Sequence, residues 1–302
     1  LAKLSDACEQ ALRDHLATVR DIVRLKYIED WQARPEDDVV DICVSFDGTW
    51  HKRGHTSHTG IGVAIDILTG YVVDFEVVLN FCLVCEREKN MEDDRTLSSL
   101  KDFMAKHKEV CTINHSGSSN AMEVAAAKKI RERSTNGPLH YVTMLSDWDS
   151  KAYDAVTNMK PYGNKLVKKE ECVNHVAKRL GAALETLKKK SQGSGVPLGG
   201  RGMLTATMIK TLQTYYQNAI KNNAGNTIAM KQAIMATPYH VTSSDDDPDH
   251  RYCPEKSWCW YKNPERPKTS PDLPKQMLEK LLPVYERLSN EQLLERCSRV
   301  ST

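Results

Sequence analysis

Two aspartates in this sequence follow hydrophobic runs that alternate as β-strands do. In the run that begins at Val40, every second residue is apolar, and Asp47 is one of the small or polar residues between them. Side chains alternate between the two faces of a strand, so Asp47 lies on the face opposite the apolar residues. Asp147, with Asp149 as the second choice, follows the run 139–145, and the carboxyl end of a strand is a typical ligand position in α/β sheets. Paired carboxylates suit Mg²⁺ and phosphodiester chemistry. The alternatives are a strand-end turn at Asp47 and a helix N-cap at the second aspartate.

Cysteine and histidine pairs form the second set of candidate ligands. Nine cysteines, an odd number in a long chain without a signal peptide, favour metal binding over a disulfide framework. Cys82-x2-Cys85 and Cys111-x3-His115 have knuckle-like spacing within a polar segment that has few apolar residues to fold it. We therefore expect a structural zinc site there, since metal can supply the missing stability. The alternative is two unrelated, partly buried pairs.

A second pair of half-sites lies further along the chain. Cys172-x2-His175 begins a basic helix, and His250-x2-Cys253 mirrors it. Two such halves can make one tetrahedral zinc site, in which Cys259 could replace a ligand. The alternative is a buried cysteine and surface histidines.

Two basic segments are candidates for phosphate contact. Lys52 and Arg53 lie in an expected hairpin turn, and Lys178 and Arg179 lie in the basic region 165–190. For the region 165–190, a helix face that is exposed to solvent is as good an explanation of the basic residues as contact with DNA. The Gly-rich loop at 193–200 lacks a Gly-Lys-Ser/Thr signature and follows a helix, so we expect no nucleotide cofactor.

The elements that must position these residues alternate between strands and helices. We expect a helix over 4–33, a polar break, and then the order β-β-β-α-β-α-β followed by a mainly helical section. The strands are predicted at 39–50, 60–68, 71–81, 139–145 and 164–167. Helices are predicted at 119–134, 150–158 and 173–190, with one or two more in 203–236 and at least one in 275–297.

Length and composition limit the class of protein. The 302 residues can form one large domain or two ordinary ones, and 27% charged with 40% hydrophobic residues is a globular composition. No apolar run approaches the ~20 residues of a membrane helix. The net charge of +2 argues against a globally basic nucleic-acid binder, but it leaves room for a local basic patch.

Several segments, spread from about residue 38 to the end, resemble the Mutator-like transposase domain found in animal genomes. They are DGTWHKRGH (47–55), HSGSSNAME (115–123), LSDWDSKAY (145–153), ECVNHVAKR (171–179), CPEKSWC (253–259) and LLERC (293–297). The strand order, with one aspartate in strand one and one after strand four, also matches the layout of an RNase H-like fold. The resemblance implies a DDE transposase that uses Mg²⁺ or Mn²⁺ to cleave DNA and transfer strands, with Asp47 and Asp147 as its first two acids.

We expect the following domain plan. An N-terminal helical segment (1–37) precedes an RNase H-like core (38–175), which carries the zinc-knuckle-like insertion (82–118). A mainly α-helical insertion (176–302) follows. The implied partners are transposon ends and target DNA in the nucleus, and a homo-oligomer is allowed.

One part of the family's pattern is missing from the sequence. Its third acid is a Glu in a helix soon after the Leu-Leu-x-x-Cys segment, and the chain stops at Thr302, about where that helix would begin. We therefore expect the chain to be truncated and inactive alone. The alternative function is a transposase-derived, catalytically inactive protein that is stabilised by zinc and acts as a DNA-binding or scaffold protein.

Overall fold

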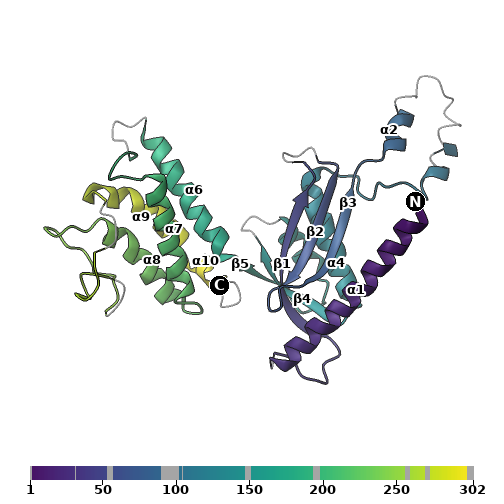
Figure 1. Cartoon of the computed structure of the whole chain (residues 1–302), viewed down its shortest axis with the longest axis horizontal. Helices are drawn as coiled ribbons and strands as arrows, with labels where there is room; N and C mark the ends of the chain where they lie inside the picture. Colours follow the sequence, from purple (N-terminus) through teal and green to yellow (C-terminus); the bar gives the residue numbers. More distant parts are fainter. Residues whose placement is uncertain are drawn as a thin grey trace. The chain divides into compact units, whose positions relative to one another are not determined.

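A five-stranded mixed sheet with flanking helices gives the chain an α/β fold (Figure 1). The computed structural model describes residues 2–30, 32–52, 57–89, 102–103, 105–146, 151–192, 198–255, 259–268 and 273–297. The chain divides into two compact units, Leu1–Lys169 and Glu170–Thr302. Each unit is described by itself.

The sheet has the strand order β3-β2-β1-β4-β5. Strands β1 and β2 pair antiparallel, as do β2 and β3, whereas β1 and β4 are parallel neighbours. This agrees with the RNase H-like arrangement predicted from the sequence. The strands are β1 (Val40–Trp50), β2 (Thr59–Asp66), β3 (Val72–Leu79), β4 (Leu139–Ser146) and β5 (Lys168–Glu171).

The predicted hairpin turn joins β2 to β3. Gly70 has a φ of 73°, a left-handed conformation that glycine adopts without a steric penalty. The carboxylate of Asp66 accepts hydrogen bonds from the backbone N–H and the hydroxyl of Thr69, at 2.8 and 2.7 Å, and from the hydroxyl of Tyr27 at 2.8 Å. This buried aspartate therefore holds the turn and also binds Tyr27 of the N-terminal helix.

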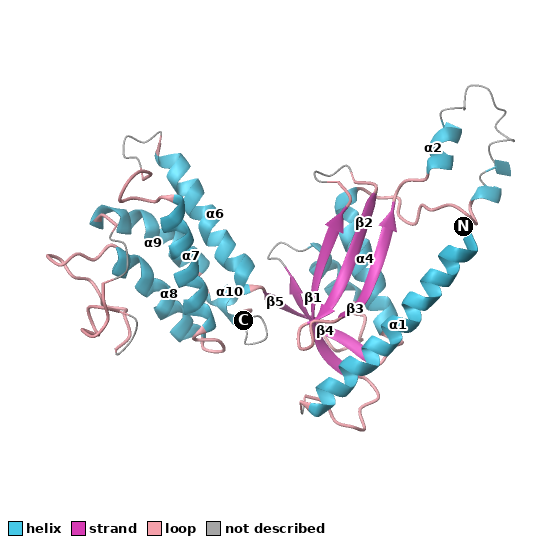
Figure 2. Ribbon diagram, viewed as in Figure 1, coloured by secondary structure: helices cyan, strands magenta, loops and turns pink. Residues whose placement is uncertain are grey.

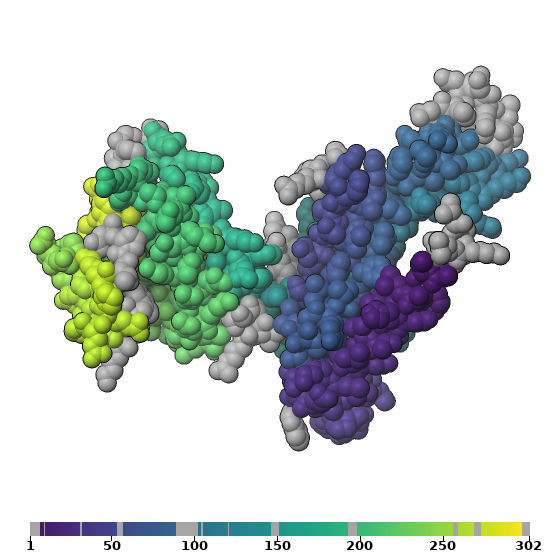
Figure 3. All heavy atoms as spheres, viewed as in Figure 1, coloured from purple at the N-terminus to yellow at the C-terminus, as the bar shows by residue number. Residues whose placement is uncertain are grey.

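Helix α4 (Ser119–Ser134) closes one face of the sheet. The apolar residues of β1, from Val40 to Phe46, are buried on this face in the core they share with α4. Gly62 of β2 permits the close approach, because a Cβ there would lie 2.5 Å from Cβ of Ala126. Helix α1 (Ala2–Glu29) packs against β3 (Figure 3). Val23 and Tyr27 of this helix belong to the same core.

The side chains of β1 that face the other side of the sheet are much less buried. Asp41 and Asp47 are exposed on this face, and Cys43 and Ser45 are only partly buried. The polar residues of β1 therefore line an accessible face of the sheet, as the alternation of the sequence predicts.

The fifth strand lies later in the chain than expected. After α5 (Lys151–Met159), the backbone turns at Lys160 and Gly163, whose φ angles are positive. The predicted strand at 164–167 is instead part of this turn, which forms a single bridge between Tyr162 and Lys165. The regular strand follows it as the fully polar sequence Lys-Lys-Glu-Glu.

Helices form the second unit after the end of β5 (Figure 2). Leu180, Leu212, Tyr216 and Leu281 are completely buried in its core. Side chains of Thr205, Asn226 and Asn290 cap three of the helices by accepting backbone N–H groups. The elements are α6 (Val173–Ser191), α7 (Ala206–Lys221), α8 (Thr227–Val241), the 3₁₀ turn η2 (Lys275–Met277), α9 (Leu278–Leu288) and α10 (Glu291–Glu295).

A long loop separates α8 from η2. None of the described residues between Val241 and Lys275 belongs to a helix or strand. Ala236, Cys253 and Cys259 form a small buried cluster at its base. Among the described helices of the whole chain, none combines the length and the hydropathy that a bilayer crossing requires.

Candidate metal centres and active-site strand

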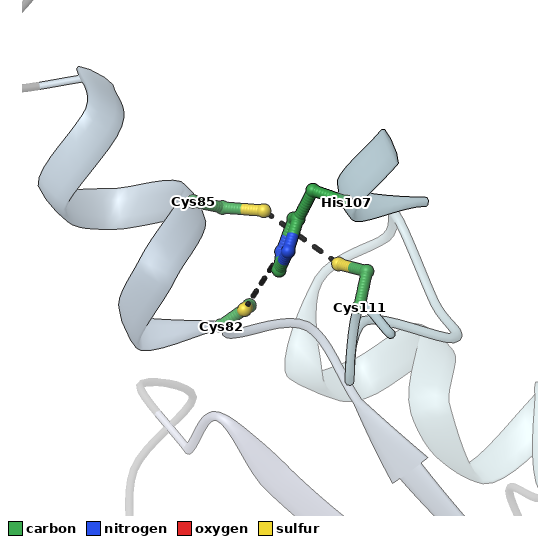
Figure 4. Close-up of side chains that lie close together, drawn as sticks. All are labelled: Cys82, Cys85, His107 and Cys111. Atoms are coloured by element: carbon green, nitrogen blue, oxygen red, sulfur yellow. Dashed lines mark hydrogen bonds between the residues drawn. The ribbon is translucent and has the colours of Figure 1, made fainter. Parts of the chain in front are cut away.

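Four side chains in the first unit converge as the first cluster, defined as Cys82, Cys85, His107 and Cys111 (Figure 4). Sγ of Cys82 lies 3.3 Å from Nε2 of His107, and Sγ of Cys85 lies 3.6 Å from Sγ of Cys111. In a tetrahedral zinc site, bond lengths of about 2.3 Å to sulfur and about 2.0 Å to nitrogen separate nitrogen from sulfur by about 3.5 Å and two sulfurs by about 3.8 Å. The first cluster has these dimensions and could hold a zinc ion.

Two short helical segments, α2 (Leu83–Lys89) and residues 105–107, contain Cys85 and His107, and Cys82 and Cys111 lie just outside them. Cys82 precedes α2 and Cys85 lies in its first turn, so that both sulfurs face one side. His107 and Cys111 approach from the opposite side of the cluster (Figure 4). The x2 and x3 spacings are those of a knuckle.

The histidine of the first cluster is His107 rather than the expected His115. The backbone N–H of His115 donates to the carbonyl of Leu79 at 3.0 Å, which fixes this residue beside the end of β3. His107 also has x3 spacing to Cys111, on its N-terminal side, so the sequence contained this signal. The buried Nε2 of His115 has no hydrogen-bond partner among the described residues.

Electrostatics in the first cluster favour one thiolate. Hydrogen bonding from the backbone at Cys85 holds the pKa of the Cys82 thiol well below its ordinary value, and His107 acts in the same direction. Burial raises the pKa of the neighbouring Cys85 thiol. A divalent cation would stabilise both thiolates, because the thiolate is the form that binds metal.

The second unit contains a second cluster, defined as His240, His250, Cys253 and Cys259, all four buried. The Nδ1 atoms of the two histidines are 3.2 Å apart. Nδ1 of His250 lies 3.7 Å from Sγ of Cys253 and 3.4 Å from Sγ of Cys259, and Nδ1 of His240 lies 3.6 Å from Sγ of Cys253. Tetrahedral zinc requires about 3.3 Å between nitrogens and about 3.5 Å between nitrogen and sulfur. This cluster could also hold a zinc ion.

Neighbouring groups orient His250 toward the second cluster. Nε2 of His250 lies 2.9 Å from Oγ of Ser243, which also accepts the backbone N–H of Asp249 at 2.9 Å. A proton on Nε2 leaves Nδ1 as the lone-pair donor, which a metal ligand needs. Burial lowers the pKa of His250 and so favours the neutral ring. The ring of Tyr261 stacks on His250 with a centroid distance of 4.4 Å.

The structure gathers only part of the predicted second zinc site. His250 and Cys253 belong to the second cluster together with Cys259, but the fourth member is His240, near the end of α8. Cys172 and His175 are in neither cluster. Cys172 is the N-cap of α6, and His175 lies in its first turn. His240 stands ten residues before His250, a separation that no short motif contains.

The predicted basic residues have different surroundings. Lys178 is exposed on α6, whereas Arg179 forms an ion pair with the completely buried Glu171. Lys52 is exposed, and its backbone N–H donates to Oγ of Ser57 at 3.3 Å. Arg53 lies outside the described residues.

Asp47 lies near the end of β1 with its side chain exposed. Its Oδ1 accepts the backbone N–H of Gly48 at 2.8 Å. Because β1 and β4 are parallel and Ser45 pairs with Leu145, Ser146 lies at the same end of the sheet as Asp47. Asp147 and its alternative Asp149 follow Ser146 in the sequence and lie outside the described residues.

The chain was compared with protein families and with known proteins. A family model described as Mutator-like transposase matches residues 2–259. The matched range contains all five strands, Asp47 and both Cys/His clusters. No curated protein and no solved structure matches the chain.

Proposed function

Because the chain belongs to the Mutator-like transposase family, we propose that the protein made from its complete coding sequence cleaves and joins DNA by phosphoryl transfer at a carboxylate pair, Asp47 and Asp147. The observation that carries the proposal is the parallel pairing of β1 with β4. Because the two strands run in the same direction, the end of β1 that bears Asp47 and the end of β4 that precedes Asp147 lie together at the carboxyl end of these strands. Open α/β sheets bind ligands at the carboxyl ends of their strands.

The surroundings of Asp47 fit a hard cation. The carboxylate is exposed, it lies on the face of small and polar side chains, and its Oδ2 accepts no hydrogen bond from a described residue. Mg²⁺ or Mn²⁺ held there would activate the attacking oxygen and stabilise the leaving oxygen of a phosphodiester. Asp47 would bind the cation from one side, and the backbone N–H of Gly48 fixes the position of its Oδ1.

Zinc at the two Cys/His clusters completes the proposed set of cofactors, in a structural role. Both clusters have closed sets of four ligands, and structural zinc sites lack the open position that catalytic sites keep. Exposed lysines such as Lys52 and Lys178 would contact the phosphates of transposon ends and target DNA in the nucleus.

The test uses protein made from its complete coding sequence and an end-labelled duplex from the flanks of that sequence. We expect strand cleavage in Mg²⁺ or Mn²⁺ that Asp47→Ala and Asp147→Ala each abolish. Asp14→Ala, which removes an exposed aspartate of α1 in the same unit, should cleave as wild type does. Cleavage that survives Asp47→Ala would overturn the assignment of Asp47.

The two Cys/His clusters favour a second candidate, a zinc-stabilised DNA-binding or scaffold protein without catalysis. The same assay separates the two functions. Salt-sensitive DNA binding without cleavage in either metal would support the second candidate, since phosphate contacts alone depend steeply on salt.

A further inference from the structure

A cavity of about 960 Å³ lies in the second unit between α7, α8 and the loop that carries the second cluster. We infer that this cavity, referred to here as the loop cavity, receives an unpaired base of DNA. The inference rests on the proposed function, because it takes DNA as the ligand. The volume is in the range of small-molecule sites and exceeds what one base requires.

Aromatic rings provide stacking surfaces in the loop cavity. Tyr215 of α7 and Trp260 of the loop are partly buried, and Tyr252 is 42% exposed. The ammonium group of Lys268 lies 4.7 Å from the ring centroid of Trp260. Every nucleobase has a flat aromatic face, so stacking binds unpaired bases with little sequence preference.

Side-chain amides supply polar groups that can pair with a base edge. Asn218 and Asn222 lie one helical turn apart at the end of α7, and Gln232 faces the loop cavity from α8. These three amides make no side-chain hydrogen bond within the part of the chain that the structure describes. Asparagine and glutamine offer a donor and an acceptor together, as the edge of a base requires.

The charge of the lining favours a phosphate backbone. Arg251, Lys262 and Arg266 contribute three positive charges, against one negative charge from Glu255. Arg251 is paired with Asp249, and Lys262 with Glu255, so even with both acids counted the lining stays positive. One partner of each pair is exposed, Arg251 with 63% and Glu255 with 76% of its side chain, so the guanidinium of Arg251 stays accessible to a phosphate. The rest of the described lining includes alanines, Thr237, Pro254 and Pro267 but no large aliphatic side chain, which argues against an apolar peptide groove.

The second cluster forms part of the wall. His240 and Cys253 line the loop cavity and are also members of that cluster. Zinc binding would therefore fix the loop against α8 and complete the site. Removal of zinc should abolish the recognition of an unpaired base.

The experiment compares two fluorescent duplexes with the zinc-loaded chain. One is fully paired, and the other carries a single base opposite an abasic analogue. We expect the unpaired probe to bind about ten-fold more tightly, which corresponds to the stacking of one base. Trp260→Ala and Gln232→Ala should each bring the ratio of the two dissociation constants close to one.

Two controls keep the result interpretable. Tyr71→Ala removes a tyrosine that is 50% exposed in the first unit, and its ratio should equal that of wild type. Trp260 lies against His250, so the zinc content of Trp260→Ala is measured, whereas Gln232 is exposed and outside the cluster.

The outcomes separate this inference from the proposed function. Equal, measurable affinity for both probes, or a ratio that neither variant changes, would overturn the base site alone. Failure to bind either probe would overturn the proposed function and the base site together.

Discussion

For a single histidine, the hydrogen bond on one ring nitrogen determines whether the other can bind metal. Ser243 holds Nε2 of His250 and so directs Nδ1 to the second cluster. In the first cluster the choice lies between two histidines that flank Cys111 at equal spacing, His107 and His115. Only His107 approaches the sulfurs, because the backbone of His115 is bonded to the end of β3.

This difference predicts separate effects of the two histidines on metal content. His107→Ala should lower the zinc bound per purified chain by about one equivalent, since three thiols alone leave the tetrahedral site incomplete. His115→Ala should keep the full zinc content, and it serves as the matched control. Mass spectrometry of the native protein, or atomic absorption, gives the count. Equal loss in both variants would contradict the ligand assignment.

Residue spacing in the sequence identifies only ligand pairs that lie close together along the chain. Cys82-x2-Cys85 and His250-x2-Cys253 could be found because each pair lies within one or two turns of chain. Tertiary structure decides which pairs meet. Spacing alone pairs Cys172-x2-His175 with His250, whereas the fold supplies His240 instead. The helical pattern around His240 predicts packing and gives no sign of a ligand.

At the scale of elements, charged hydrogen bonds join β3 to α4. The guanidinium of Arg133 contacts Asp74 at 2.9 Å and Glu76 at 2.6 Å, and Lys129 contacts Glu76 at 2.9 Å. Burial alone would raise the pKa of Glu76, but the hydrogen bonds from Arg133 and Lys129 outweigh it, and the pKa is lowered. Helix and strand are therefore held together most firmly while this carboxylate is ionised.

The lowered pKa of Glu76 predicts an acid-labile contact in the first unit. Its stabilisation is fully present above the ordinary value of 4.5 and is lost as the pH falls through the lower folded-state pKa. Glu76→Gln should cost about 1–2 kcal/mol at pH 7, since both partners are partly solvent-screened, and should flatten the loss of stability below pH 4.5. Urea unfolding at several pH values measures this. Glu36→Gln, at an exposed pair, should change neither quantity, and an identical pH slope for wild type and Glu76→Gln would refute the contact's role.

The strands differ in how well alternation defines them. In β1 the alternating apolar residues from Val40 to Phe46 identify the strand and its buried face, and Thr69-Gly70 identifies the next hairpin. β5 consists of four charged residues, so it has no hydrophobic pattern, and alternation favours the more apolar residues 164–167 instead. Its place at the sheet edge comes from pairing, which sequence periodicity does not record.

At the scale of the whole molecule, each unit has its own core and its own Cys/His cluster. Ile42 is buried in the first core and Leu180 in the second. We expect two unfolding transitions in calorimetry. Ile42→Ala should lower only one of them and Leu180→Ala only the other, each by about 2–5 kcal/mol of unfolding free energy. If either variant shifts both transitions together, the units unfold cooperatively and this prediction is wrong.

The segment between α8 and η2 has a consequence for how long the protein survives in a cell. Its described residues have no regular structure, and loops of this length are uncommon within compact units. Cys253 and Cys259 tie the loop to the helix through the second cluster, with basic residues such as Arg251 and Lys262 close by. If zinc fills the second cluster, its loss should expose the described loop residues around Cys253 and Cys259 to proteases, which cut at exposed loops. The lifetime of the second unit would then depend on the supply of zinc.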